Sequence, residues 1–93
     1  MKSFHLSARV DTESPRKIEP VLRRLTGEGS VSKDNGEFVV DARMEGDSAK
    51  DLNRELLSSL RRVEKKTRLR AEWTSGTTTE RYFDYVLKKR VSS

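Results

Sequence analysis

The densest run of charge in the sequence lies between residues 61 and 70, where six basic side chains accompany one acidic side chain. The basic residues are Arg61, Arg62, Lys65, Lys66, Arg68 and Arg70. Clustered lysines and arginines are typical of surfaces that contact the phosphate backbone of nucleic acids. A plainer interpretation stays open, in which the first four complement the negative end of a helix dipole and solvate its outer face.

Few side chains in the sequence suit catalysis. It contains no cysteine and a single histidine, His5, which excludes a thiolate metal site or cysteine nucleophile and disfavours a catalytic dyad. Asp41, Glu45 and Asp47 fit magnesium poorly, because the first two lie on a strand and the third in a turn before a helix. Serine and threonine hydroxyls have no evident base to activate them. We expect a non-catalytic protein that binds no cofactor and no metal.

The chain is long enough for one small domain. Its 93 residues are 32% hydrophobic and 38% charged, so residues 1–93 are expected to share one modest core. No apolar run approaches the roughly 20 residues that cross a bilayer. We expect a soluble, cytoplasmic protein with no membrane contact and no small-molecule substrate.

The positive charge is concentrated in the second half of the chain. Residues 1–46 carry 8 basic and 8 acidic side chains, whereas residues 47–93 carry 12 basic and 7 acidic ones, which accounts for the net charge of +5. A polyanionic partner would therefore meet the second half.

Alternating apolar and polar residues predict the strands that position these charges. The alternation covers residues 4–10, 38–44 and 69–73. Asn35-Gly36 tolerates the positive backbone angles of a tight turn, so it joins a short strand at residues 30–34 to the strand at 38–44.

Two helices are predicted between these strands. Apolar residues recur at helical spacing over residues 18–25 and again over residues 49–63. Because Pro20 cannot donate an interior helical hydrogen bond, the first regular helix is expected to begin near residues 17–19. Ser48 stands where it would cap the second helix.

The order of these elements is βαββαβ, which favours a ferredoxin-like plait. In that fold an antiparallel sheet has the strand order 4-1-3-2, and both helices cover one face. The strands at 4–10 and 38–44 would be central, in agreement with their strong alternation.

The segment from residue 77 to residue 91 admits two interpretations. Thr77 with Glu80 fits a capping box, and apolar residues recur at helical spacing, which predicts a third helix as an extension docked on the domain. Against this, Ser75-Gly76 suits a hairpin turn, and threonine, aromatic and β-branched residues favour a fifth strand.

One face of the predicted sheet gathers further arginines. Arg68 and Arg70 point away from the helices, and Arg9 and Arg43 from the central strands are expected on the same face. Acidic residues there, Asp41, Glu45 and Glu72, are able to pair with these arginines across strands. Because the central strands lack outward aromatic residues, binding would depend on backbone charge and shape, or on Tyr82, Phe83 or Tyr85.

Self-association competes with nucleic-acid binding for this face. Val39 projects there, and an open sheet of this size often needs a cover. The predicted interface residues are Val39, Tyr82, Phe83 and Val86.

The junction of the third strand and second helix resembles a known family. The run Val40-Asp41-Ala42-Arg43-Met44-Glu45-Gly46-Asp47-Ser48-Ala49, followed by Leu56-Leu57-Ser58-Ser59-Leu60-Arg61, is similar to the small dimerising subunit of the archaeal KEOPS tRNA-modification complex. The resemblance covers about 20 residues and implies a non-catalytic scaffold subunit that contacts a kinase-like partner.

The sequence thus predicts a small basic protein that binds nucleic acid, with RNA as the first choice. The expected contacts are Arg9, Arg43, Arg68 and Arg70, with Arg61, Arg62, Lys65 and Lys66 at the edge. The alternative is a homodimeric protein-interaction module or a scaffold subunit of a larger complex of the tRNA-modification type.

Overall fold

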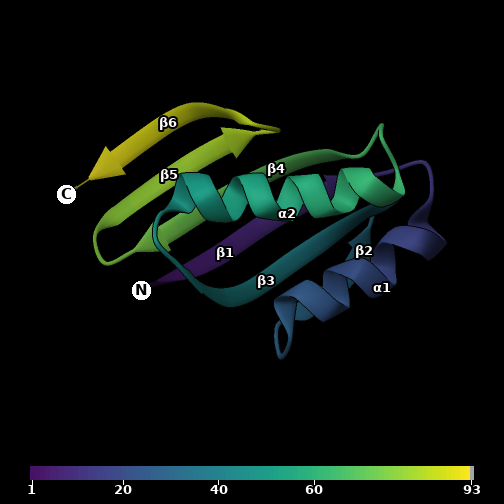
Figure 1. The fold of residues 1–93 in the computed structure, drawn as a ribbon, viewed down its shortest axis with the longest axis horizontal. Helices are drawn as coiled ribbons and strands as arrows, with labels where there is room; N and C mark the ends of the chain where they lie inside the picture. The colour runs from purple at the N-terminus through teal and green to yellow at the C-terminus, as the bar shows by residue number, and fades with distance from the viewer. Residues whose placement is uncertain (93) are drawn as a thin grey trace.

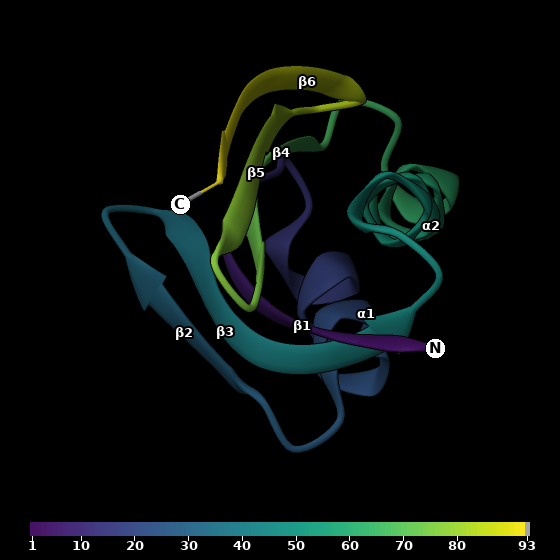
Figure 2. The ribbon, with the colours of Figure 1, turned by 90° about the vertical axis from the view of Figure 1, so that its left-hand side faces the viewer.

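The structure, a computed structural model that describes residues 1–92, contains six strands and two helices in those residues. The elements are β1 (Lys2–Asp11), α1 (Pro15–Thr26), β2 (Ser30–Asp34), β3 (Glu37–Gly46), α2 (Ala49–Val63), β4 (Arg68–Ser75), β5 (Thr78–Phe83) and β6 (Val86–Ser92). The strands form one antiparallel sheet with the order β2-β3-β1-β4-β5-β6 (Figure 1). Strands β2 and β6 are its two edges (Figure 2).

The predicted ferredoxin-like plait with a C-terminal helix is therefore wrong. In the plait β4 would be an edge strand, but here β4 lies between β1 and β5, and two further strands extend the sheet beyond it. The physical reason is the open edge of β4, whose backbone groups are paired by β5 instead of being left to solvent.

The predicted third helix over residues 77–91 is likewise wrong, and the strand alternative holds for its first part. Gly76, at a φ of +59°, begins the tight connection between β4 and β5. Asp84, at a φ of +54°, does the same between β5 and β6. A left-handed residue in the middle of the segment is incompatible with a continuous helix, and the threonine and aromatic residues suit a sheet.

Both helices pack on the sheet and bury its alternate residues. Helix α1 contacts β2 and β3, and α2 contacts β3 and β4. Ser48 caps α2 as predicted, because its hydroxyl accepts the N–H of Asp51 at 3.1 Å. Helix α1 begins earlier than predicted, at Pro15, because the amides of Lys17 and Ile18 already bond to the carbonyl of Ser14 ahead of Pro20.

The core lies on the helix-packed face of the sheet. Apolar side chains from β1, β3 and β4 meet the apolar stripes of α1 and α2 there, and Phe4 stands edge-on to the Trp73 ring at 6.5 Å. The indole N–H of Trp73 donates to Asn53 Oδ1 at 3.1 Å, so the buried polar atoms of both residues are satisfied. No helix among residues 1–92 is long and apolar enough to cross a membrane.

Candidate nucleic-acid interface

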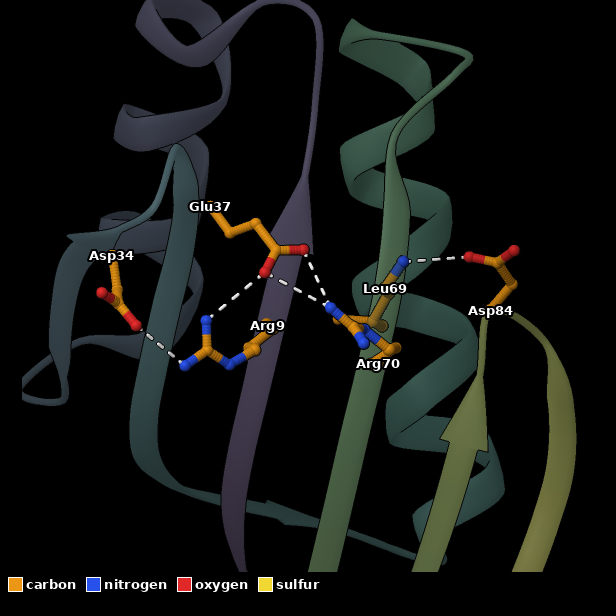
Figure 3. A network of polar contacts seen from close by, with 6 residues as sticks. All are labelled: Arg9, Asp34, Glu37, Leu69, Arg70 and Asp84. Atoms are coloured by element: carbon orange, nitrogen blue, oxygen red, sulfur yellow. Dashed lines mark hydrogen bonds and ion pairs between the residues drawn. The ribbon is translucent and has the colours of Figure 1, made fainter.

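The opposite face of the sheet, which we call the charged face, carries two arginines directly opposite each other. Arg9 on β1 and Arg70 on β4 are cross-strand partners, and the Glu37 carboxylate lies between their guanidinium groups (Figure 3). Glu37 Oε1 accepts from Arg9 Nη1 at 3.3 Å, and Glu37 Oε2 accepts from Arg70 Nη2 at 2.9 Å. A single carboxylate therefore relieves the repulsion of two opposed cations.

Further carboxylates pair with Arg9, Arg81 and His5 on this face. Asp34 accepts from Arg9 Nη2 at 3.0 Å, and this hydrogen bond raises the pKa of the Arg9 guanidinium above its usual value. Glu72 accepts from Arg81 Nε at 2.7 Å, and Asp41 lies 2.8 Å from His5 Nε2. The charged face is thus a ladder of paired charges, and a phosphate would have to displace a carboxylate to reach Arg9, Arg70 or Arg81.

A shallow hollow of about 410 Å³ lies at the centre of the charged face. Ser7 and Val39 line it among the arginines that the carboxylates hold, and this is where the structure places the predicted interface residue Val39. The arginines and the glutamate that line the hollow are held in ion pairs, so a phosphate backbone would have to displace a carboxylate there.

The turn between β5 and β6 is fixed by Asp84. The side chain of Asp84 is only 16% exposed, and its Oδ1 accepts the N–H of Leu69 at 2.9 Å (Figure 3). Its backbone N–H donates to the Leu69 carbonyl at 2.7 Å, and its carbonyl accepts from Asn53 Nδ2 at 2.8 Å. This turn is therefore tied to both β4 and α2.

Two arginines close over this turn and lie on aromatic rings. Arg61 reaches Asp84 Oδ1 at 3.4 Å and lies 5.2 Å above the Tyr85 ring, whose hydroxyl is 3.1 Å from Ser58 Oγ. Arg68 lies 3.7 Å from Asp84 Oδ2 and 5.7 Å above the Phe83 ring. Phe83 is 37% exposed and Tyr85 is 45% exposed, so each ring carries a guanidinium and still meets solvent.

Four of the predicted cations form no ion pair within residues 1–92, namely Arg43, Arg62, Lys65 and Lys66. Arg43 lies far along β3, opposite His5. The other three lie at the end of α2 and in the connection to β4, close in sequence to Arg61 and Arg68.

The acidic residue in that connection does not neutralise these cations directly. Glu64 accepts instead from the Ser14 hydroxyl at 2.8 Å and from the Lys66 backbone N–H at 3.3 Å. These two hydrogen bonds lower the pKa of Glu64, and they tie the connection before β4 to the one before α1.

The predicted sites thus fall into separate places. Arg9 and Arg70 belong to the paired ladder of the charged face, Arg61 lies at the turn, and Arg43 stands apart. Arg68 pairs with Asp84 at the turn and also lines a hollow with Arg9, Arg70 and Phe83 at that end of the charged face. Among the predicted interface residues, Phe83 and Val86 are exposed, but Tyr82 is 3% exposed and its hydroxyl donates to Glu80 at 2.8 Å. Tyr82 is therefore part of the core in this fold.

Sequence reasoning missed the residues of the C-terminal hairpin. The predicted site does not include Arg81, Asp84, Lys88, Lys89 or Arg90, because neither interpretation of residues 77–91 predicted a hairpin with a turn at Asp84. The signal that was available is Asp84 itself, since aspartate tolerates left-handed geometry and favours turns.

Comparison with known proteins does not identify a family for this chain. Within residues 1–92 no group of three or more His, Cys, Asp or Glu side chains is arranged to hold a metal ion. No protein-family model, no curated protein and no solved structure matches the chain.

Proposed function

We propose that the protein binds single-stranded nucleic acid without catalysis, with RNA as the first choice, at the end of the sheet formed by the β5–β6 turn. We call it the turn surface, and it consists of two exposed rings, the arginines that lie over them and three cations, unpaired within residues 1–92, that are close to these arginines in sequence: Arg61, Arg62, Lys65, Lys66, Arg68, Phe83 and Tyr85. The observation that carries the proposal is the pair of exposed rings that each lie against an arginine. Bases stack on such rings regardless of sequence, and arginine adds cation–π attraction.

The distribution of charge supports this location. Residues 61–93 carry 10 basic and 4 acidic side chains, a net charge of +6, while residues 1–60 carry 10 basic and 11 acidic ones, a net charge of −1. Neutralisation of phosphates releases counterions, so affinity would concentrate in the positively charged part of the chain.

The proposal assigns little nucleic-acid affinity to the paired arginines Arg9 and Arg70 of the charged face. Arg9 and Arg70 share Glu37. If a phosphate bound these two arginines, the Glu37 carboxylate would lose its ion-pair partners. We expect these two arginines to stabilise the sheet and to contribute little to nucleic-acid affinity.

Fluorescence anisotropy with a labelled oligouridylate tests the proposal at about 50 mM and about 200 mM salt. Phe83→Ala is expected to weaken binding by roughly five- to a hundredfold, the range for loss of one stacked base. Lys65→Ala/Lys66→Ala should weaken binding and reduce the salt slope by about 1 to 2. Tyr85→Phe keeps its ring and should bind like the wild type.

The matched control is Lys2→Ala/Lys50→Ala, which removes the same charge from exposed positions outside the turn surface. If the control pair weakens binding as much as the Lys65/Lys66 pair, attraction is general and the turn surface is not the site. Absence of binding at low salt would refute the proposal. An oligothymidylate of equal length tests the preference for RNA.

The alternative function, a protein-interaction module or scaffold subunit, has support at a different surface. Val86, Leu87 and Val91 on β6 are 56%, 46% and 47% exposed. Uncovered apolar side chains of this kind are typical of contact surfaces. The homodimer and the resemblance to the tRNA-modification subunit stay predictions, which a molar mass from light scattering and a binding assay with such a partner would test.

A further inference from the structure

Strand β6 is an open edge of a different kind from β2. Strand β2 has five residues, and its apolar residue Val31 is buried. Strand β6 has seven residues, every one of which is exposed, and among residues 1–92 it pairs only with β5. Its outer backbone N–H and C=O groups are therefore available to another extended chain.

The side chains of β6 combine apolar ends with a cationic centre. Val86 and Leu87 precede the run Lys88-Lys89-Arg90, and Val91 follows it. Within residues 1–92 the three cations form no ion pair, unlike Arg9, Arg70 and Arg81 on the charged face. Lys89 is paired with Arg81 and Arg90 with Glu80, so these two charges are presented on opposite sides of the sheet. Lys88 lies at a register shift and has no partner on β5.

The charge pattern argues against a second copy as the occupant. If two β6 strands paired antiparallel about their centres, Lys88 would face Arg90, and Lys89 would face its own symmetry mate. Like charges directly opposite each other destabilise a strand pair. An acidic strand would instead place carboxylates against all three cations and valine-like side chains against Val86 and Val91.

We propose that β6 binds an extended acidic segment of a partner protein by strand addition, with the acidic residues central and apolar residues at both ends. Main-chain hydrogen bonds along the free edge would supply affinity, and Lys88, Lys89 and Arg90 would select the partner by charge. This inference is independent of the proposed function, because it concerns the edge of the sheet and not the turn surface.

The probe is a fluorescein-labelled heptapeptide with three central glutamates and two valines on each side. Anisotropy should show salt-dependent binding, and amide exchange should show new protection within residues 86–92. A control peptide with all four valines replaced by proline keeps the charge but loses ladder donors whichever alternate residues face β6, so it should bind at least several-fold more weakly.

Charge reversal on the protein separates this proposal from the proposed function. Lys88→Glu/Lys89→Glu/Arg90→Glu should reduce peptide affinity at least roughly tenfold, while Lys65→Glu/Lys66→Glu should reduce oligouridylate binding and leave the peptide bound. If the charge-reversed variant does not fold, amide protection in the wild-type protein decides the question.

Three outcomes would overturn the inference. The first is equal binding of the proline peptide, which would leave only general charge attraction. The second is peptide-induced protection outside residues 86–92. The third is absence of peptide binding, in which case the edge cations serve only to prevent aggregation of an open strand, a known use of edge lysines.

Discussion

Strands β1, β3 and β4 are held in the sheet by different forces from the last two strands. Strands β1 and β4 each bury their alternate side chains beneath the helices, and Leu6, Val10 and Leu69 have no exposed surface. In β5 and β6 only Tyr82 is buried, and all of β6 meets solvent. Hydrophobic burial thus holds the first region, while the second depends on backbone pairing and on polar contacts at one turn.

The region that supplies most of the stability is therefore not the region whose groups are free to bind a partner. In β1 and β4 the apolar side chains are buried in the core, and Arg9 and Arg70 are held in ion pairs on the charged face. The C-terminal hairpin keeps aromatic rings, unpaired cations and an open backbone edge. Both proposed binding surfaces therefore involve the region that contributes least to the core.

The largest expected effect on the free energy of unfolding comes from a substitution in the buried core. Trp73→Ala should lower the free energy of unfolding by about 3–5 kcal/mol, because it leaves a cavity against Phe4 and removes the donor to Asn53. Leu87→Ala on β6 should change it by no more than about 0.5 kcal/mol. Urea denaturation followed by far-ultraviolet circular dichroism measures both, and similar losses would contradict the proposed division.

A smaller effect is expected from the turn that anchors the hairpin. Asp84→Gly keeps the positive φ but removes the carboxylate that accepts from Leu69 and faces Arg61 and Arg68, which should cost about 2 kcal/mol. Faster exchange of the Leu69 amide should accompany the loss.

Asp84→Asn serves as the matched variant. Asparagine tolerates the same backbone geometry and keeps one acceptor oxygen for the Leu69 amide, so it should lose less than glycine does. If glycine and asparagine cost the same, the carboxylate does not anchor the hairpin and the turn geometry alone is sufficient.

The limits of sequence reasoning follow the same division. Residues 4–10 and 69–73 were predicted as strands because alternate side chains are buried there, and burial leaves a period of two in the sequence. In residues 77–91 the apolar residues fit helical spacing, yet Tyr82 alone is buried. The deciding contact, from Asp84 to Leu69, joins residues far apart in the chain and leaves no local pattern.

The candidate site shows a similar limit. The sequence predicted that Asp41, Glu45 and Glu72 would pair with the arginines of the sheet face, but Glu72 pairs with Arg81 and Asp41 with His5. It did not identify Glu37, which begins β3 and reaches Arg70 across the intervening β1. That reach depends on strand order and register, which charge spacing alone does not specify.

Apart from that of Leu87→Ala at an exposed position, the smallest expected effect on the free energy of unfolding is that of Tyr82→Phe, which alters the one buried residue of the C-terminal hairpin. Burial, reinforced by the hydrogen bond to Glu80, raises the pKa of Tyr82 from 10.0 to about 12. The neutral phenol is thus favoured in the fold, and its contribution is complete below about pH 10 and lost as the pH rises through about 12. Phenylalanine lacks this titration and should cost about 1 kcal/mol at neutral pH through the lost hydrogen bond. Urea denaturation across this range should show the wild type losing its advantage over the variant, whereas a constant difference would mean that the ring is not buried in solution and that the hairpin does not join the core.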